Sequence, residues 1–146
     1  MTKTNTLALI ALLALTAAAQ NVVLASSGLS TNVIAPVGRV AKLESYHNAN
    51  QNDFLGNGAK WIWVNGSNQN GDIFLAVTFK ATFQTLFYAD CPDQAASLKI
   101  RADGDLTVYF NGNKVLVGDN WKKVYSADVK LTCGLNNLTI TVETPN

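Results

Sequence analysis

The chain has 146 residues, a formal net charge of +1 from 11 Lys and Arg against 10 Asp and Glu, and only 14% charged residues. This length suits one domain that buries a hydrophobic core without depending on several disulfides or metals. The low, balanced charge argues against nucleic acid or an anionic membrane as a partner, because both need clustered Lys and Arg. The many aliphatic and aromatic residues argue against intrinsic disorder.

The first 19 residues have the pattern of a secretory signal peptide. Lys3 supplies a positive charge, Leu7–Leu15 is apolar, and Thr16–Ala19 contains small residues. This pattern predicts cleavage after Ala19, with a second candidate site after Ala25. A membrane anchor is the alternative, but polar residues interrupt the apolar stretch before the ~20 residues that a spanning helix needs. We therefore expect a secreted protein without membrane insertion, whose processed form has a net charge of zero because Lys3 is lost.

Secretion affects how the two cysteines, Cys91 and Cys133, are interpreted. In an oxidising compartment an isolated pair is most simply one disulfide. Closing a loop of ~43 residues would stabilise the fold by about 4 kcal/mol in the chain-entropy description. A redox or nucleophilic cysteine is the alternative, but the chain has no C-x-x-C motif and its single histidine, His47, is far from both cysteines in sequence.

Two Asn-x-Ser/Thr sequons become candidates for N-glycosylation if the secreted protein is eukaryotic. Asn65 lies in a predicted loop and is the favoured acceptor. Asn137 begins a predicted strand, so it accepts a glycan only if its side chain faces outward.

Residues 26–42 contain Ser, Gly, Asn and Pro without a clear periodicity. They predict a partly flexible N-terminal arm ahead of a domain that spans residues 43–146. Within this domain, apolar and polar residues alternate with a period of two, as in half-buried strands. No segment of the processed chain has apolar residues at helical spacing over three turns. The alternating segments are 60–64, 73–84, 97–102, 106–111, 114–117 and 138–143.

Two dipeptides between these segments predict tight hairpin turns. Asp103-Gly104 and Asn111-Gly112 supply the positive φ that type I′ turns require. Residues 97–117 are therefore expected to form a three-stranded meander. About eight short antiparallel strands in ~100 residues indicate an all-β domain, either a sandwich or a barrel.

Five motifs follow one another along residues 59–143. They are Ala59-Lys-Trp-Ile-Trp63, Val77-Thr-Phe-Lys-Ala-Thr-Phe83, Ala96-Ser-Leu-Lys-Ile-Arg-Ala-Asp103, Val108-Tyr-Phe-Asn-Gly112 and Cys133-Gly-Leu-Asn136. This series resembles the galactose-binding-domain-like jelly-roll modules, in particular those attached to bacterial α-rhamnosidases and related glycosidases. The resemblance implies a single antiparallel jelly-roll β-sandwich that binds carbohydrate.

The matched residues are expected to determine the fold before they contact any ligand. Trp61 and Trp63 share one strand face and should fill the core beside Phe79 and Phe83, because aromatic side chains dominate burial. Asn136 belongs to the turn into the last strand. A Trp near position 121 recurs in the resembling modules, so Trp121 either contacts a ligand or covers the edge of the core.

The residue types that catalysis requires are scarce. The two glutamates, Glu44 and Glu143, are near opposite ends of the processed chain, and there is no G-x-S-x-G, H-E-x-x-H or phosphate-loop motif. We therefore expect no enzymatic activity. A single histidine argues against zinc. Oxygen-rich stretches make Asp53 and Asp72 weak candidates for a structural calcium site, and no other cofactor is expected.

A carbohydrate site would combine an aromatic ring with amides and carboxylates. Three predicted loops carry such residues: Tyr46 with His47, Tyr88 with Asp90, and Asn120 with Trp121. The first hypothesis is a secreted, non-catalytic β-sandwich that binds a glycan or glycoprotein. The alternative is a structural subunit of an extracellular coat, matrix, filament or secretory granule. Its copies would assemble by strand addition through residues 26–42, helped by zero net charge.

Overall fold

The computed structural model describes residues 12–17, 22–28, 30–43, 59–64, 80–90 and 95–143. These residues form eleven β-strands and no helix. Every strand pair that they form is antiparallel. The expected all-β, antiparallel class is thus confirmed. No helix in the described part of the chain has the length and apolarity to cross a membrane.

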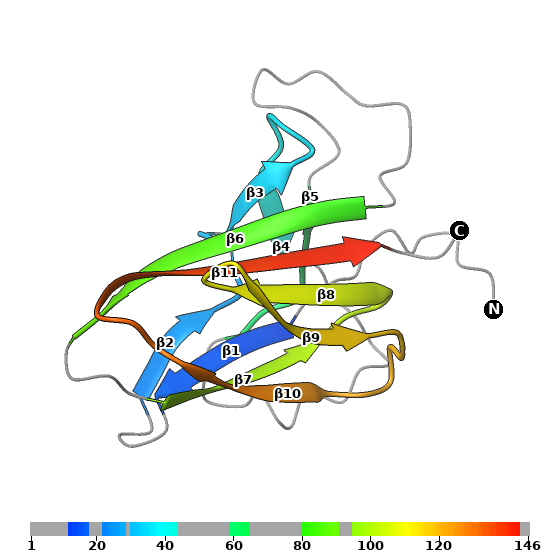
Figure 1. Ribbon diagram of the computed structural model, residues 1–146. Coiled ribbons are helices and arrows are strands. Elements are labelled where there is room, and N and C mark those ends of the chain that lie inside the picture. The colour runs from blue at the N-terminus through cyan, green and yellow to red at the C-terminus, as the bar shows by residue number, and fades with distance from the viewer. Residues whose placement is uncertain are drawn as a thin grey trace.

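The strands form two larger sheets and a short ribbon, and Figure 1 shows the five-stranded sheet above the four-stranded one. The four-stranded sheet has the order β10 (Tyr125–Lys130), β7 (Ala95–Arg101), β1 (Leu12–Ala17), β2 (Val22–Ser26). The five-stranded sheet has the order β3 (Asn32–Ala35), β6 (Lys80–Ala89), β11 (Gly134–Glu143), β8 (Asp105–Phe110), β9 (Asn113–Gly118). The ribbon pairs β4 (Ala41–Leu43) with β5 (Ile62–Val64).

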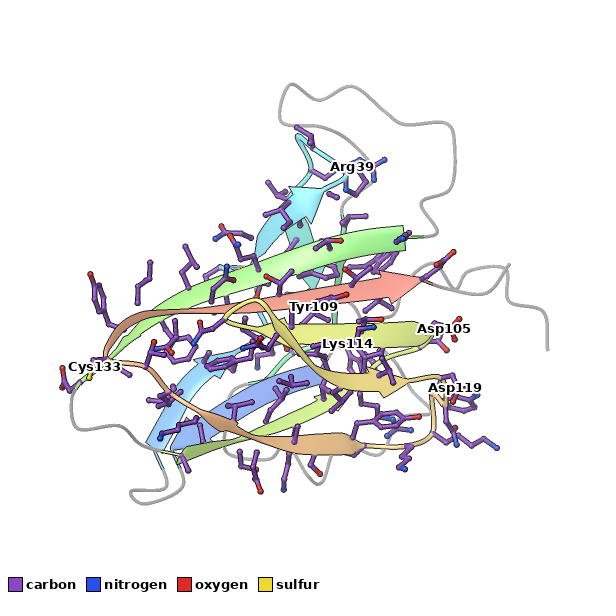
Figure 2. All side chains as sticks on the ribbon, in the orientation of Figure 1. Arg39, Asp105, Tyr109, Lys114, Asp119 and Cys133 are labelled. Atoms are coloured by element: carbon purple, nitrogen blue, oxygen red, sulfur yellow. The ribbon has the colours of Figure 1, made fainter. Side chains whose placement is uncertain are left out.

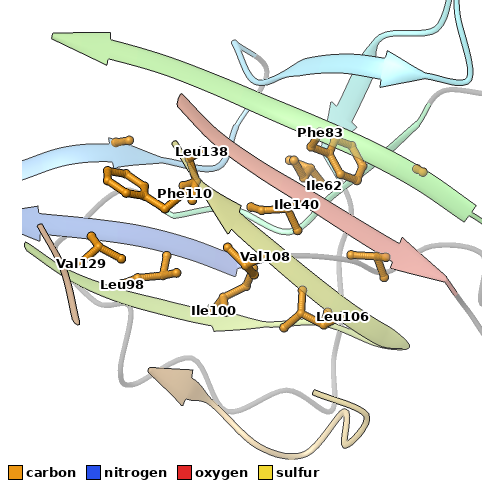
Figure 3. Packing of buried hydrophobic residues seen from close by; sticks show 14 of the residues in the cluster. Ile62, Phe83, Leu98, Ile100, Leu106, Val108, Phe110, Val129, Leu138 and Ile140 are labelled. Carbon is orange, nitrogen blue, oxygen red and sulfur yellow. The ribbon is translucent and has the colours of Figure 1, made fainter. Parts of the chain in front are cut away.

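The core lies between the two sheets because alternate residues of their strands face inward. Leu98 and Ile100 of β7 are fully buried, as are Val108 of β8 and Leu138 of β11 (Figure 3). The polar residues between them are more exposed, as the period of two predicts. Alternation in the sequence therefore identified the inward faces of these strands correctly.

The two tryptophans expected in the core are buried there. The Trp63 ring centroid lies 5.9 Å from that of Phe83, with the ring planes tilted by 55°. The segment of residues 61–64 departs from simple alternation, because Trp61 and all three residues of β5 are buried. A segment buried on both faces has no polar side to reveal its period.

The two predicted hairpins have different outcomes. Asn111 and Gly112 have φ values of 50° and 85° and connect the paired strands β8 and β9, so this turn is confirmed. Asp103-Gly104 does not form a hairpin, because β7 belongs to the four-stranded sheet and β8 to the five-stranded sheet. The predicted meander over residues 97–117 is therefore wrong. Asp103 is buried where the chain passes from one sheet to the other.

The N-terminal part of the chain contributes strands to both sheets. β1 lies within the predicted signal peptide and pairs with β7 and β2 on its two sides. The predicted arm contains β3, an outer strand of the five-stranded sheet, and most of β4. Cleavage after Ala19 would therefore remove an inner strand of the uncut chain.

Candidate functional site

The ligand candidates among the described residues, Tyr88 with Asp90 and Asn120 with Trp121, do not converge on one place. Tyr88 precedes Ala89, which lies opposite Gly134 at the start of β11. Trp121 follows β9, and the last residue of β9, Gly118, lies opposite Leu106 of β8. Leu106 in turn pairs with Val142, near the end of β11. Val142 is eight positions along β11 from Gly134, which corresponds to about 27 Å. Figure 2 shows the same separation, with Cys133 at one end of the molecule and Asp119 at the other.

Several other candidates lie outside the described residues. They are the ligand candidates Tyr46 and His47, the calcium candidates Asp53 and Asp72, the sequon residue Asn65, and Cys91. Within the described ranges, no group of three or more His, Cys, Asp and Glu side chains is placed to hold a metal ion.

The turn between β9 and β10 carries the candidates Asn120 and Trp121, and we call residues Gly118–Tyr125 the Trp121 turn. Its tip is closed by a hydrogen bond from the Lys123 backbone N–H to the Asn120 carbonyl oxygen, at 3.1 Å. The Asn120 Oδ1 atom accepts a second hydrogen bond from the Lys122 backbone N–H, at 3.0 Å. Asn120 thus builds the turn with its side chain, a common use of Asn in turns.

Tyr125 holds the turn from the side of β10. Its hydroxyl oxygen accepts hydrogen bonds from the backbone N–H groups of Asp119 and Asn120, at 3.1 and 3.0 Å. Its ring lies against Gly118, where an added Cβ would come within 2.5 Å of the ring atoms. The Lys123 ammonium lies 4.9 Å from the ring centroid. Only glycine leaves room at position 118 for the ring that anchors the turn.

Trp121 is partly exposed at the tip of this turn. Its carbonyl oxygen accepts a hydrogen bond from the Nε–H of Arg101, at 2.9 Å. Arg101 is buried although alternation placed it on the polar face of its strand. The Lys122 ammonium lies 5.4 Å from the centroid of the Trp121 ring, a cation–π distance. Nothing in the sequence pattern indicates that Arg101 and Tyr125 support this turn, because both contacts depend on tertiary structure.

The chemistry of the Trp121 turn suits a neutral polar ligand with an apolar face. It offers a partly exposed indole beside the exposed side chains of Asp119, Asn120 and Lys122. An aromatic surface with a few fixed polar groups is the usual composition of a small-molecule site. A sugar ring has C–H groups that pack on an aromatic ring and hydroxyls that exchange hydrogen bonds with amide, carboxylate and ammonium groups.

Tyr88 and Asp90 lie in different surroundings at the other end of the sheet. Tyr88 is 76% exposed and lies opposite Leu135, which is 55% exposed. Leu86, two residues earlier on the same strand, is 46% exposed. We call Leu86, Tyr88 and Leu135 the apolar strip. Asp90 is also exposed. This end therefore presents three exposed apolar side chains on neighbouring strands, with an exposed carboxylate after β6.

No family model, curated protein or solved structure shows significant similarity to this chain.

Proposed function

We propose that the protein is a secreted, non-catalytic carbohydrate-binding module and that its glycan contact is the Trp121 turn. The observation that carries this proposal is the partly exposed Trp121 on a turn held by Asn120, Tyr125 and Arg101. A turn that is ordered before binding loses little conformational entropy when a ligand arrives. Tyr88 and Asp90 are not part of this site, because they lie at the opposite end of β11.

We further propose that the fold is a galactose-binding-like jelly roll. Two antiparallel sheets, of four and five strands in the uncut chain, pack around an aliphatic and aromatic core and support this assignment. The register of β6 and β11 also supports the predicted Cys91–Cys133 disulfide. Ala89 lies opposite Gly134, so the chain leaves β6 beside Cys133 and reaches Cys91 two residues later. Peptide mass mapping without reductant should find the cross-linked pair, and two free thiols would contradict it.

A glycan array probed with the purified protein tests the carbohydrate proposal. The Trp121→Ala variant should lose the signals that the unaltered protein gives. Tyr88→Ser is the matched control, because it removes an exposed aromatic ring from the other end of the sheet. An array without signal above background, or equal loss in both variants, would contradict a glycan site at the Trp121 turn.

A second candidate function is self-assembly as an extracellular structural subunit. The position of β3 at the edge of its sheet favours this function. β3 is an outer strand of its sheet, and such a strand offers backbone groups for pairing with another chain. Around it, Ile34, Val37, Val40 and Leu43 are exposed, with Val37 at 87%. Light scattering after size-exclusion chromatography tests this function. Large assemblies that Ile34→Lys dissolves would support it, and a monomeric protein would exclude it.

A further inference from the structure

Asn137 can accept a glycan only if its side chain faces outward from the strand, and it does so. Its neighbours Asn136 and Leu138 are fully buried, whereas Asn137 is partly exposed on the alternate face of β11. Its side chain therefore lies on the outer face of the five-stranded sheet. Unlike Asn65, the acceptor that the sequence favoured, Asn137 lies among the described residues.

The amide of Asn137 is arranged for attachment of a sugar. Its Oδ1 atom accepts a hydrogen bond from the Thr139 hydroxyl at 3.0 Å, so the two functional residues of the sequon contact each other. Its backbone N–H donates to Asn111 Oδ1 at 2.7 Å, which holds the strand in place. Within the described residues no hydrogen bond occupies its Nδ2 atom, the atom that carries an N-glycan.

The apolar strip lies next to Asn137 on the same face. Leu86 is the direct cross-strand partner of Asn137, and Tyr88 is the partner of Leu135, two residues earlier on β11. Directly opposite residues have Cβ atoms about 5 Å apart, and diagonal neighbours about 7–8 Å. All three strip residues are therefore within reach of the first sugars of a chain attached to Asn137.

We propose that Asn137 carries an N-linked oligosaccharide and that this glycan covers the apolar strip. In the transfer, Nδ2 forms a bond to C1 of the oligosaccharide, the bond between C1 and its lipid diphosphate carrier breaks, and Nδ2 loses one proton. The C–H face of the sugar packs on Tyr88 and Leu135 while its hydroxyls remain in water. The glycan thus keeps copies of the protein from associating through this face. The proposal rests on the proposed secretion, and it is independent of glycan binding at the Trp121 turn.

The first test is the occupancy of Asn137 in protein secreted by a eukaryotic host. Intact mass before and after peptide N-glycosidase treatment, followed by peptide mapping, locates the sugar. Thr139→Ala should abolish the modification at Asn137, whereas Thr139→Ser keeps the sequon and should retain it. An exported protein with unmodified Asn137 overturns the proposal. A protein that is not exported contradicts the proposed secretion instead, so the two failures are distinguishable.

The second test is whether the glycan shields the strip. Enzymatic removal from the folded protein avoids any failure of a variant to fold. We expect deglycosylation to increase binding of an apolar dye and to raise the mass in solution about twofold, as for a symmetric dimer. Tyr88→Ser together with Leu135→Ser should suppress both changes. Dye binding and mass that stay the same after deglycosylation would overturn the shielding role.

Discussion

The side-chain amide of Asn111 donates a hydrogen bond to the Oδ1 atom of Asn136, at 2.9 Å. This contact joins the hairpin between β8 and β9 to the first residues of β11. The same Oδ1 atom accepts hydrogen bonds from the backbone N–H and the hydroxyl of Thr132, at 2.9 and 3.1 Å. The Asn136 Nδ2 atom donates to the carbonyl oxygens of Thr132 and Gly134. A fully buried amide thus has partners for both its polar atoms.

Replacing Asn136 by leucine should therefore destabilise the protein by about 2–4 kcal/mol, because buried donors and acceptors lose their partners. Urea unfolding followed by tryptophan fluorescence measures this change. Asn113→Ala is the control, since Asn113 is exposed on β9, and it should change stability by less than about 0.5 kcal/mol. Equal stability of both variants would show that the Asn136 network does not hold the fold.

Gly118→Ala should disturb the Trp121 turn. The added Cβ would meet the Tyr125 ring at 2.5 Å, so the ring or the backbone must move, at a cost of about 1–3 kcal/mol. The hydroxyl of Tyr125 would then lose its hydrogen bonds to Asp119 and Asn120. Near-ultraviolet circular dichroism and glycan affinity should both change. Gly28→Ala is the control, because nothing lies within 4 Å of a Cβ at that position; an unchanged Gly118→Ala protein would contradict the observed packing.

Trp121→Ala should weaken binding to the best glycan of the array by about 10- to 100-fold, the effect of truncating a central aromatic contact. Tyr88→Ser should change the affinity by less than about twofold, because distant sites act independently. Titration calorimetry with the soluble oligosaccharide measures both constants. A larger effect at Tyr88 than at Trp121 would move the site to the opposite end of the sheet.

Signal cleavage should alter hydrogen exchange in β7. Ala96–Arg101 pair with β1 on one side, and Ala96–Ile100 also pair with β10 on the other, so about half of these amides face β1. In the processed protein these amides should exchange roughly tenfold faster or more than in the uncut chain. Amides between β8 and β11 serve as the internal control. Identical protection of β7 in both forms would mean that the edge left by β1 has been covered again.

Alternation predicts β5, the first half of β6, β7, β8, β9 and the second half of β11, because its signal is local, whereas no alternating segment covers β1 to β4 or β10. Alternation identified the inward residues Leu98, Val108 and Leu138. The dipeptide Asn111-Gly112 identified a hairpin from two residues alone, because these residue types accept the positive φ that they have in the structure. The Asp103-Gly104 prediction failed because the same turn chemistry also serves a connection between sheets. Which sheet a strand joins depends on pairing with distant strands, and alternation carries no information about the partner.

The sequence by itself determined the all-β class, the inward faces of β7, β8 and β11 and the scarcity of catalytic side chains, since these follow from residue type and short-range spacing. Tertiary structure alone decided that Tyr88 and Trp121 lie at opposite ends of β11, that Arg101 is buried beneath the Trp121 turn, and that Asn137 neighbours the apolar strip. These relationships depend on the register between strands that are far apart in the chain. Register is set by which faces pack together in the core, and the core exists only when the whole chain has folded.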